Sequence, residues 1–176
     1  MKQNITIHHR KTIRLKEYDY SQPGGYFVTL CTHEKVCVFG EVVEDEVRLS
    51  LIGAIAKRFW DEIPNHFPMA EMDEYIVMPN HIHGIIVLND HGRDVQLNVP
   101  TRLSPRRGTL SVIIRTYKAA VTMECRKMGY SEFGWQSRYY DHIIRDGKDL
   151  DRICDYIVEN PVKWYLDENN PNRPIE

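Results

Sequence analysis

The run at 81–88, His-Ile-His-Gly-Ile-Ile-Val-Leu, constrains the fold more than any other feature of this sequence. Its second half is apolar and β-branched, which predicts a buried strand, and the preceding Pro-Asn pair marks a turn. Side chains alternate between the two faces of a strand, so His81 and His83 share one face while Ile82 enters the other. The run therefore places two imidazoles side by side at the start of a buried strand.

The rest of the chain alternates between strand and helix patterns. Strands are predicted at 26–32, 75–78 and 135–144, a hairpin at 36–49 with its acidic tip at 44–46, and a long loop at 89–108. Helices are predicted from Ser50 to Pro64, from Thr109 or Ser111 onward, and from Asp149 or Asp151 onward. This order predicts an α+β fold, with a ferredoxin-like arrangement of helices packed on an antiparallel sheet.

Length and composition fit one domain. The 176 residues, 42% hydrophobic and 27% charged, are ordinary for a single globular unit over 1–176, with a basic N-terminal arm at 1–20 and a loose tail at 167–176. No run approaches the roughly 20 apolar residues of a membrane helix. The four cysteines are scattered without a CxxC pair, so we expect a reducing, cytoplasmic setting and no membrane partner.

Charge is distributed unevenly, although the net charge is only −2. The N-terminal residues are basic, and the stretch 95–123 contains no acidic residue. Local basic patches form the footprint for phosphates, whereas the alternative for each patch is ordinary solvated surface. The residues predicted to bind DNA are Arg10, Lys11, Arg14, Arg106, Arg107, Arg115 and Lys118.

Two histidines do not complete a metal site, and the last predicted helix offers a further ligand. Tyr156 and Asn160 are spaced i and i+4, so on a continuing helix they share a face. An amide oxygen is a competent hard ligand, and a phenol one turn away would lie beside the metal. Taken singly, each motif has a simpler interpretation. The two histidines could be hydrogen-bonded to backbone groups, and Asn-Pro could be no more than the end of the helix.

Three motifs together resemble a known family. Met-Pro-Asn-His-Ile-His at 78–83, Trp-Gln-Ser-Arg-Tyr-Tyr-Asp at 135–141 and Tyr-Ile-Val-Glu-Asn-Pro-Val at 156–162 are similar to the single-tyrosine transposases with an HUH motif. Asparagine at 160 and the opening of the chain resemble the REP-associated branch. The resemblance implies a ferredoxin-like fold with the HUH motif on a central strand and a nucleophilic tyrosine on the C-terminal helix. It implies that His81, His83 and Asn160 bind the metal and that Tyr156 is the nucleophile.

The implied activity is metal-dependent cleavage and strand transfer of single-stranded DNA. The intermediate would be a 5′-phosphotyrosine, and the partner a single strand with hairpin structure, bound by a monomer or homodimer. A free tyrosine has a pKa near 10 and is a poor nucleophile, which explains the need for a divalent cation on the phosphate. Mixed nitrogen and oxygen ligands suit Mn²⁺, and Mg²⁺ is the other candidate. The alternative function is a DNA-hairpin-binding module with little or no cleavage activity.

Overall fold

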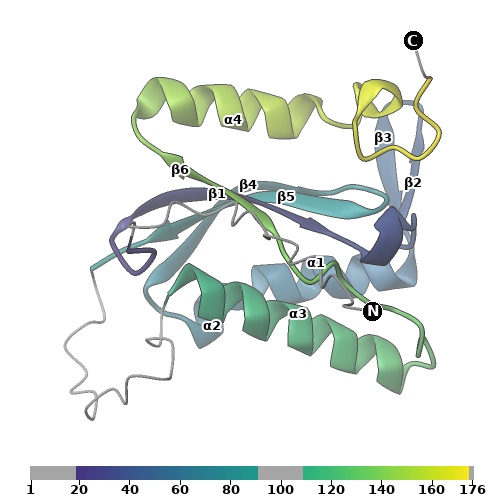
Figure 1. Ribbon diagram of the computed structural model, residues 1–176, viewed down its shortest axis with the longest axis horizontal. Coiled ribbons are helices and arrows are strands. Elements are labelled where there is room, and N and C mark those ends of the chain that lie inside the picture. Colours follow the sequence, from purple (N-terminus) through teal and green to yellow (C-terminus); the bar gives the residue numbers. More distant parts are fainter. Residues whose placement is uncertain (1–18, 91–108, 175–176) are drawn as a thin grey trace, which may run out of the picture.

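The computed structural model describes residues 19–90 and 109–174 (Figure 1). Along the chain its elements are β1 (Gly24–Cys31), the 3-10 turn η1 (His33–Lys35), β2 (Gly40–Val43), β3 (Glu46–Leu49), α1 (Leu51–Asp61), α2 (Ile63–His66), β4 (Ala70–Val77), β5 (His81–Leu88), α3 (Leu110–Lys127), β6 (Tyr140–Ile144), α4 (Gly147–Glu159) and the 3-10 turn η2 (Trp164–Leu166).

Four strands form one antiparallel sheet in the order β4-β5-β1-β6. With α1 between β1 and β4, and α3 between β5 and β6, this is the ferredoxin-like arrangement, and the predicted fold class is confirmed. The strand that carries the two histidines, β5, lies between β4 and β1 and is therefore central. The β2–β3 hairpin is inserted between β1 and α1 and turns at Glu44 and Asp45, which both have positive φ.

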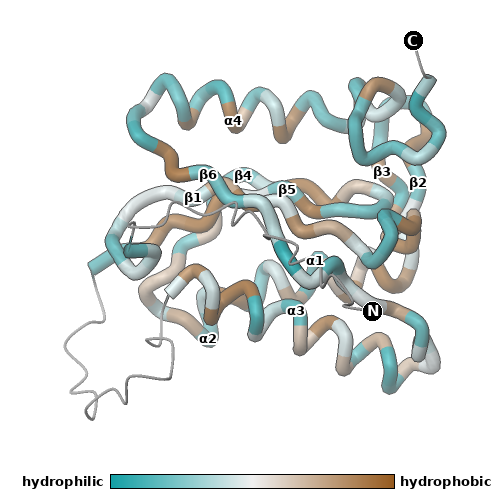
Figure 2. Tube along the Cα trace, in the orientation of Figure 1, coloured by the Kyte–Doolittle hydropathy of each residue, from teal (hydrophilic) through white to brown (hydrophobic). Residues whose placement is uncertain are grey.

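The two faces of the sheet carry different layers (Figure 1). Below the sheet in that view, α1 and α3 cover side chains such as Val28, Ile82 and Ile86, and this is the main core. Above it, α4 packs on a smaller cluster formed by Phe27, Ile85 and its own residues Ile153 and Ile157. Figure 2 shows many hydrophobic residues along the strands and a mixture of hydrophobic and hydrophilic residues on the helices below, whereas α4 is mostly hydrophilic.

Below the sheet, β5 packs closely against α1 at Gly84. Gly84 follows His83, and a Cβ added to it would lie 2.3 Å from Cζ2 of Trp60, a fully buried indole on α1. Only glycine lets the indole approach the strand this closely. The strand β5, which carries the two histidines, therefore packs directly against the main core. No helix of the described ranges 19–90 and 109–174 is long and apolar enough to cross a membrane.

Several element boundaries match the expectations. Ser50 caps α1 by accepting from the Gly53 N–H at 3.1 Å, and Thr109, one of the two candidates, caps α3. The last helix starts earlier than predicted, because Asp146 is the cap and accepts from the Asp149 N–H at 2.9 Å. The predicted loop at 89–108 lies almost entirely outside the described residues.

The strand predicted at 135–144 is confirmed only over its second half. Trp135 turns into the main core, and Lys118 of α3 donates hydrogen bonds to the carbonyls of Gln136 and Arg138 at 2.9 and 3.1 Å. Those carbonyls are therefore directed at an ammonium group rather than at a neighbouring strand. Regular pairing with β1 begins only at Tyr140.

The tail predicted to be loose from Asp167 onward is instead held at its start. Asn169 is buried, and its carbonyl accepts a 2.7 Å hydrogen bond from the side chain of Asn80. The Asn170 N–H donates to the carbonyl of Asp167 at 3.0 Å. The polar composition suggested solvent exposure, but these residues satisfy buried polar groups beside the start of β5.

Candidate metal and nucleophile site

His81 and His83 both point from β5 toward α4. Their pairing partners on β1 are Cys31 and Thr29, and the two imidazole rings lie 4.4 Å apart between centroids. The side chains are 0% and 2% exposed. Ile82, between them, belongs to the main core on the opposite face. The alternation read from the sequence is confirmed.

The ring orientation of His81 is set by Asn80. Both hydrogens of the Asn80 amide are taken, one by the carbonyl of Lys35 at 2.8 Å and one by that of Asn169 at 2.7 Å. The atom left for His81 is the amide oxygen, which lies 2.9 Å from Nδ1 and can only accept. Nδ1 therefore carries the proton, and the lone pair is on Nε2. Histidines that bind metals usually have this tautomer, fixed by a hydrogen bond from the ring N–H that does not face the metal.

His83 has a comparable arrangement with a hydroxyl. Its Nδ1 lies 2.9 Å from Oγ1 of Thr29, the residue opposite it on β1. Its Nε2 lies 3.2 Å from the hydroxyl of Tyr156. Both histidines thus have Nδ1 bound to a neighbour on or beside the sheet, and Nε2 directed at α4 or the segment that follows it.

Tyr156 and Asn160 are brought to the histidines by α4. Ile153 and Ile157 anchor the helix in the cluster under it, which turns Tyr156 toward His83 and Phe27. Asn160 keeps helical angles, φ −58° and ψ −40°, although proline follows it. The two side chains therefore share a face as their spacing predicted. Asn160 is buried, whereas Tyr156 is 43% exposed and accessible to a large substrate.

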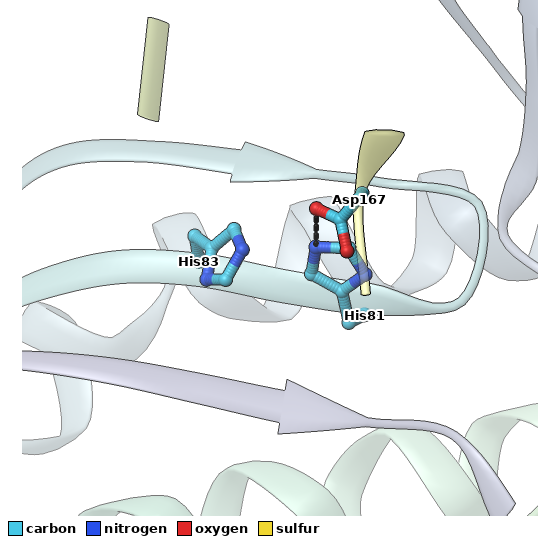
Figure 3. A group of neighbouring side chains, drawn as sticks. All are labelled: His81, His83 and Asp167. Atoms are coloured by element: carbon cyan, nitrogen blue, oxygen red, sulfur yellow. Dashed lines mark ion pairs between the residues drawn. The ribbon is translucent and has the colours of Figure 1, made fainter. Parts of the chain in front are cut away.

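Asp167 is a member of the site that the sequence reasoning missed. Its Oδ2 lies 3.9 Å from Nε2 of His81 and accepts a 3.3 Å hydrogen bond from the amide of Asn160. Ligand atoms of His81, His83 and Asp167 all lie within 4.8 Å of one another (Figure 3). The only signal in the sequence was an acidic residue seven positions after Asn160. Its neighbours are polar and suggested a loose tail, so the residue was not considered as a ligand.

The charge states suit a cation site. Burial lowers the pKa of His81 to about 3, assisted by the charge of Lys35 and opposed by Asn160. Burial and the neighbouring His81 hold the pKa of His83 well below its ordinary value. Burial, with the charge of Asp167, raises the pKa of Tyr156 to about 12. At neutral pH both imidazoles are neutral and offer lone pairs, and the phenol keeps its proton.

Two atoms of this cluster are buried without a hydrogen-bond partner among the described residues. They are Nε2 of His81 and Oδ1 of Asn160. Buried polar atoms are normally paired, and leaving one unpaired costs about 1–3 kcal/mol. A nitrogen lone pair and an amide oxygen are both good ligands for a divalent cation. The residues therefore fit the ion that the sequence resemblance implies.

A cleft of about 600 Å³ opens beside Tyr156 and His83. Its lining residues come from β1, η1, β5, β6 and α4 and from the segments at 136–139 and 168–169. Basic and aromatic side chains contribute to its lining, among them Lys35, Arg138, His142 and Arg152 with Phe27, Tyr139 and Tyr140, and the acidic Glu168 also lines it. Such a lining matches the phosphates and bases of a single strand.

Of the residues predicted to bind DNA, only Arg115 and Lys118 lie in the described ranges. Arg115 is exposed on α3, the helix on the far face of the sheet from the site. Lys118 has its ammonium bound to two carbonyls, and burial lowers its pKa to about 8. Neither is brought to the cleft. The other five are Arg10, Lys11, Arg14, Arg106 and Arg107, which lie outside the described residues.

Comparisons with known proteins point in one direction. No protein-family model matches the sequence. A Haemophilus influenzae protein of unassigned function is 40% identical over 174 residues, which is 95% of this chain and 96% of that protein. Another protein of that species, provisionally named a REP-associated tyrosine transposase, is 25% identical and covers 82% of this chain and 74% of its own length. A solved structure of a REP-associated tyrosine transposase bound to a REP hairpin has a TM-score of 0.58 and 23% identity, over 85% of this chain and 74% of that one. This last likeness shows a shared fold.

Proposed function

We propose that the chain is a member of the REP-associated tyrosine transposases, and that it cuts and rejoins single-stranded DNA at a hairpin, with Tyr156 as the nucleophile. The observation that carries the proposal is the position of the Tyr156 hydroxyl, 3.2 Å from Nε2 of His83, at the mouth of a basic and aromatic cleft. The hairpin partner is inferred from the relative that was solved bound to a REP hairpin.

The site would hold one divalent cation, Mg²⁺ or Mn²⁺, through Nε2 of His81, Nε2 of His83 and Oδ1 of Asn160. When bound, the cation would offset charge on the scissile phosphate as it becomes pentacoordinate. The unpaired Nε2 and Oδ1 atoms support this assignment.

The protein's own residues would position the reaction. The cleft seats the strand, so that Oη of Tyr156 lies in line with the phosphorus atom. A bond forms between Oη and phosphorus, and the bond from phosphorus to the 3′ oxygen breaks. The phenolic proton is released to solvent, and the leaving oxygen takes a proton from solvent to become a 3′-hydroxyl. The phosphodiester energy is kept in the 5′-phosphotyrosine, so a second 3′-hydroxyl can reverse the step on another strand.

The test is a cleavage assay on a hairpin oligonucleotide with single-stranded flanks, labelled at either end. We expect a covalent protein–DNA adduct on the 5′ end of the downstream fragment, formed with Mn²⁺ and absent in EDTA. His81→Ala combined with His83→Ala should abolish the adduct, whereas His66→Ala, an exposed histidine of α2, should leave it unchanged.

Three outcomes would contradict the proposal in different ways. Metal-dependent cleavage without an adduct would mean that water is the nucleophile and the protein is a nuclease. Hairpin binding with no cleavage under any metal would favour the binding module. Wild-type cleavage in EDTA by the double histidine variant would remove the metal from the account.

A further inference from the structure

The chain beyond α4 packs against the start of β5 and does not project into solvent. After η2, the segment 167–170, which we name the C-terminal strap, lies beside the turn before His81 (Figure 1). Asn80 donates to the Asn169 carbonyl at 2.7 Å, and Lys35 donates to the Glu168 carbonyl at 3.3 Å. The residue that orients His81 therefore also anchors the strap.

The carboxylate of Asp167 is buried, and no lysine or arginine of the described residues lies in ion-pair range of it. Its side chain is 4% exposed, and within the described residues the only basic group in ion-pair range is His81. The remaining contacts are neutral donors, the Asn169 N–H at 2.6 Å and the Asn160 amide at 3.3 Å. A buried anion in this position is costly unless a cation is bound beside it.

The arrangement of donor atoms fits one ion. In an octahedral site with bonds of 2.0–2.1 Å, opposite ligand atoms are about 4.2 Å apart. Adjacent ligand atoms are about 2.9 Å apart in such a site. Ligand atoms of His81, His83 and Asp167 lie within 4.8 Å of one another, so an inward movement of these side chains by about 1 Å brings all three to one ion. Figure 3 shows the carboxylate directed at the imidazole of His81.

We propose that Asp167 is a ligand of the divalent cation, together with His81, His83 and Asn160, and that the C-terminal strap closes the metal site. This inference rests on the proposed function, because it concerns the same cation. It adds a charged oxygen to a set of neutral donors, which strengthens binding of hard cations such as Mn²⁺ and Mg²⁺. It also couples the metal to the chain that follows the nucleophile helix.

The structure suggests a simpler role against which this must be tested. Oδ1 of Asp167 accepts the Asn169 N–H and so forms a local turn, which alone could explain the residue. Asp167→Asn keeps an oxygen for that turn and removes the charge. Glu168→Gln is the matched control. Glu168 is the next residue along the chain, its side chain is exposed and lies outside the cluster, and the substitution removes the same charge.

The experiment is calorimetric titration of the DNA-free protein with Mn²⁺ at pH 7.5. We expect Asp167→Asn to raise the Kd by about 10- to 100-fold, the range found when groups that support a metal site are removed. Glu168→Gln should stay within about threefold of the wild type. Hydrogen exchange of the wild type should show that Mn²⁺ slows exchange of the Asn169 and Asn170 amides, a measurement that needs no variant.

The outcomes separate this inference from the proposed function. If the wild type binds Mn²⁺ and Asp167→Asn binds it equally well, or if Mn²⁺ leaves exchange in the strap unchanged, Asp167 is only a turn residue and the function stands. Equal weakening by Asp167→Asn and Glu168→Gln would also overturn the inference, because it would reflect net charge alone. A wild type that binds no Mn²⁺ would overturn the metal in both proposals.

Discussion

Asn80→Ala should weaken both the fold and the metal site, since one buried amide supports each. The side chain is 0% exposed and makes three hydrogen bonds, to the Lys35 carbonyl, the Asn169 carbonyl and Nδ1 of His81. Each hydrogen-bond partner that is left unpaired and out of reach of water lowers the free energy of unfolding by about 1–3 kcal/mol. Water can reach the carbonyl of Lys35, which is only partly buried, so two full penalties give a loss of about 2–6 kcal/mol. That is a large share of the 5–15 kcal/mol typical of a domain.

The assay is urea unfolding in EDTA, with Mn²⁺ titration of the same samples. Without the amide oxygen, His81 loses the contact that fixes its tautomer, and we expect Mn²⁺ affinity to fall by about 10- to 100-fold. Asn65→Ala, at an exposed position in α2, serves as the control and should change stability by less than about 0.5 kcal/mol. A loss below about 1 kcal/mol for Asn80→Ala, with unchanged Mn²⁺ affinity, would refute the reasoning.

Three further predictions follow from the site and the sequence. Tyr156→Phe should stop adduct formation while hairpin binding and Mn²⁺ binding persist, and Tyr140→Phe, in the same cleft, should retain the adduct. Replacing Arg106 and Arg107 together should lower the salt slope of binding by roughly one to two units if both contact phosphate, at about 0.7 per contact for single strands; an unchanged slope would make them ordinary surface. Gly84→Ala should cost about 1–3 kcal/mol in urea unfolding by overpacking the indole beneath it, and a neutral effect would show that β5 can shift.

The parts of the site that follow from local periodicity could be predicted from the sequence. Alternation along a strand placed His81 and His83 on one face, and the helical period placed Tyr156 and Asn160 together. Both relations hold within a single element, so no knowledge of the fold was needed. The order of strand and helix patterns was likewise sufficient for the fold class.

The supporting contacts could not be predicted, because they depend on how distant segments meet. Thr29 reaches His83 through the register of β1 on β5, which no local pattern determines. Asp167 reaches His81 across 86 positions, through the turn at η2, and its polar surroundings indicated a loose tail. The strand expected from 135 failed for a related reason, since Trp135 is drawn into the main core.

The central claim is that Tyr156 forms the covalent bond to DNA, and mapping the adduct by mass spectrometry tests it most directly. Tryptic cleavage places Tyr156 alone in the peptide 153–163, apart from Tyr139 and Tyr140 in 139–145 and Tyr117 in 116–118. After reaction with a hairpin oligonucleotide and Mn²⁺ and digestion of the DNA, we expect a phosphorylated tyrosine in 153–163 only. A phosphotyrosine in either of the other peptides, with 153–163 unmodified, would contradict the account.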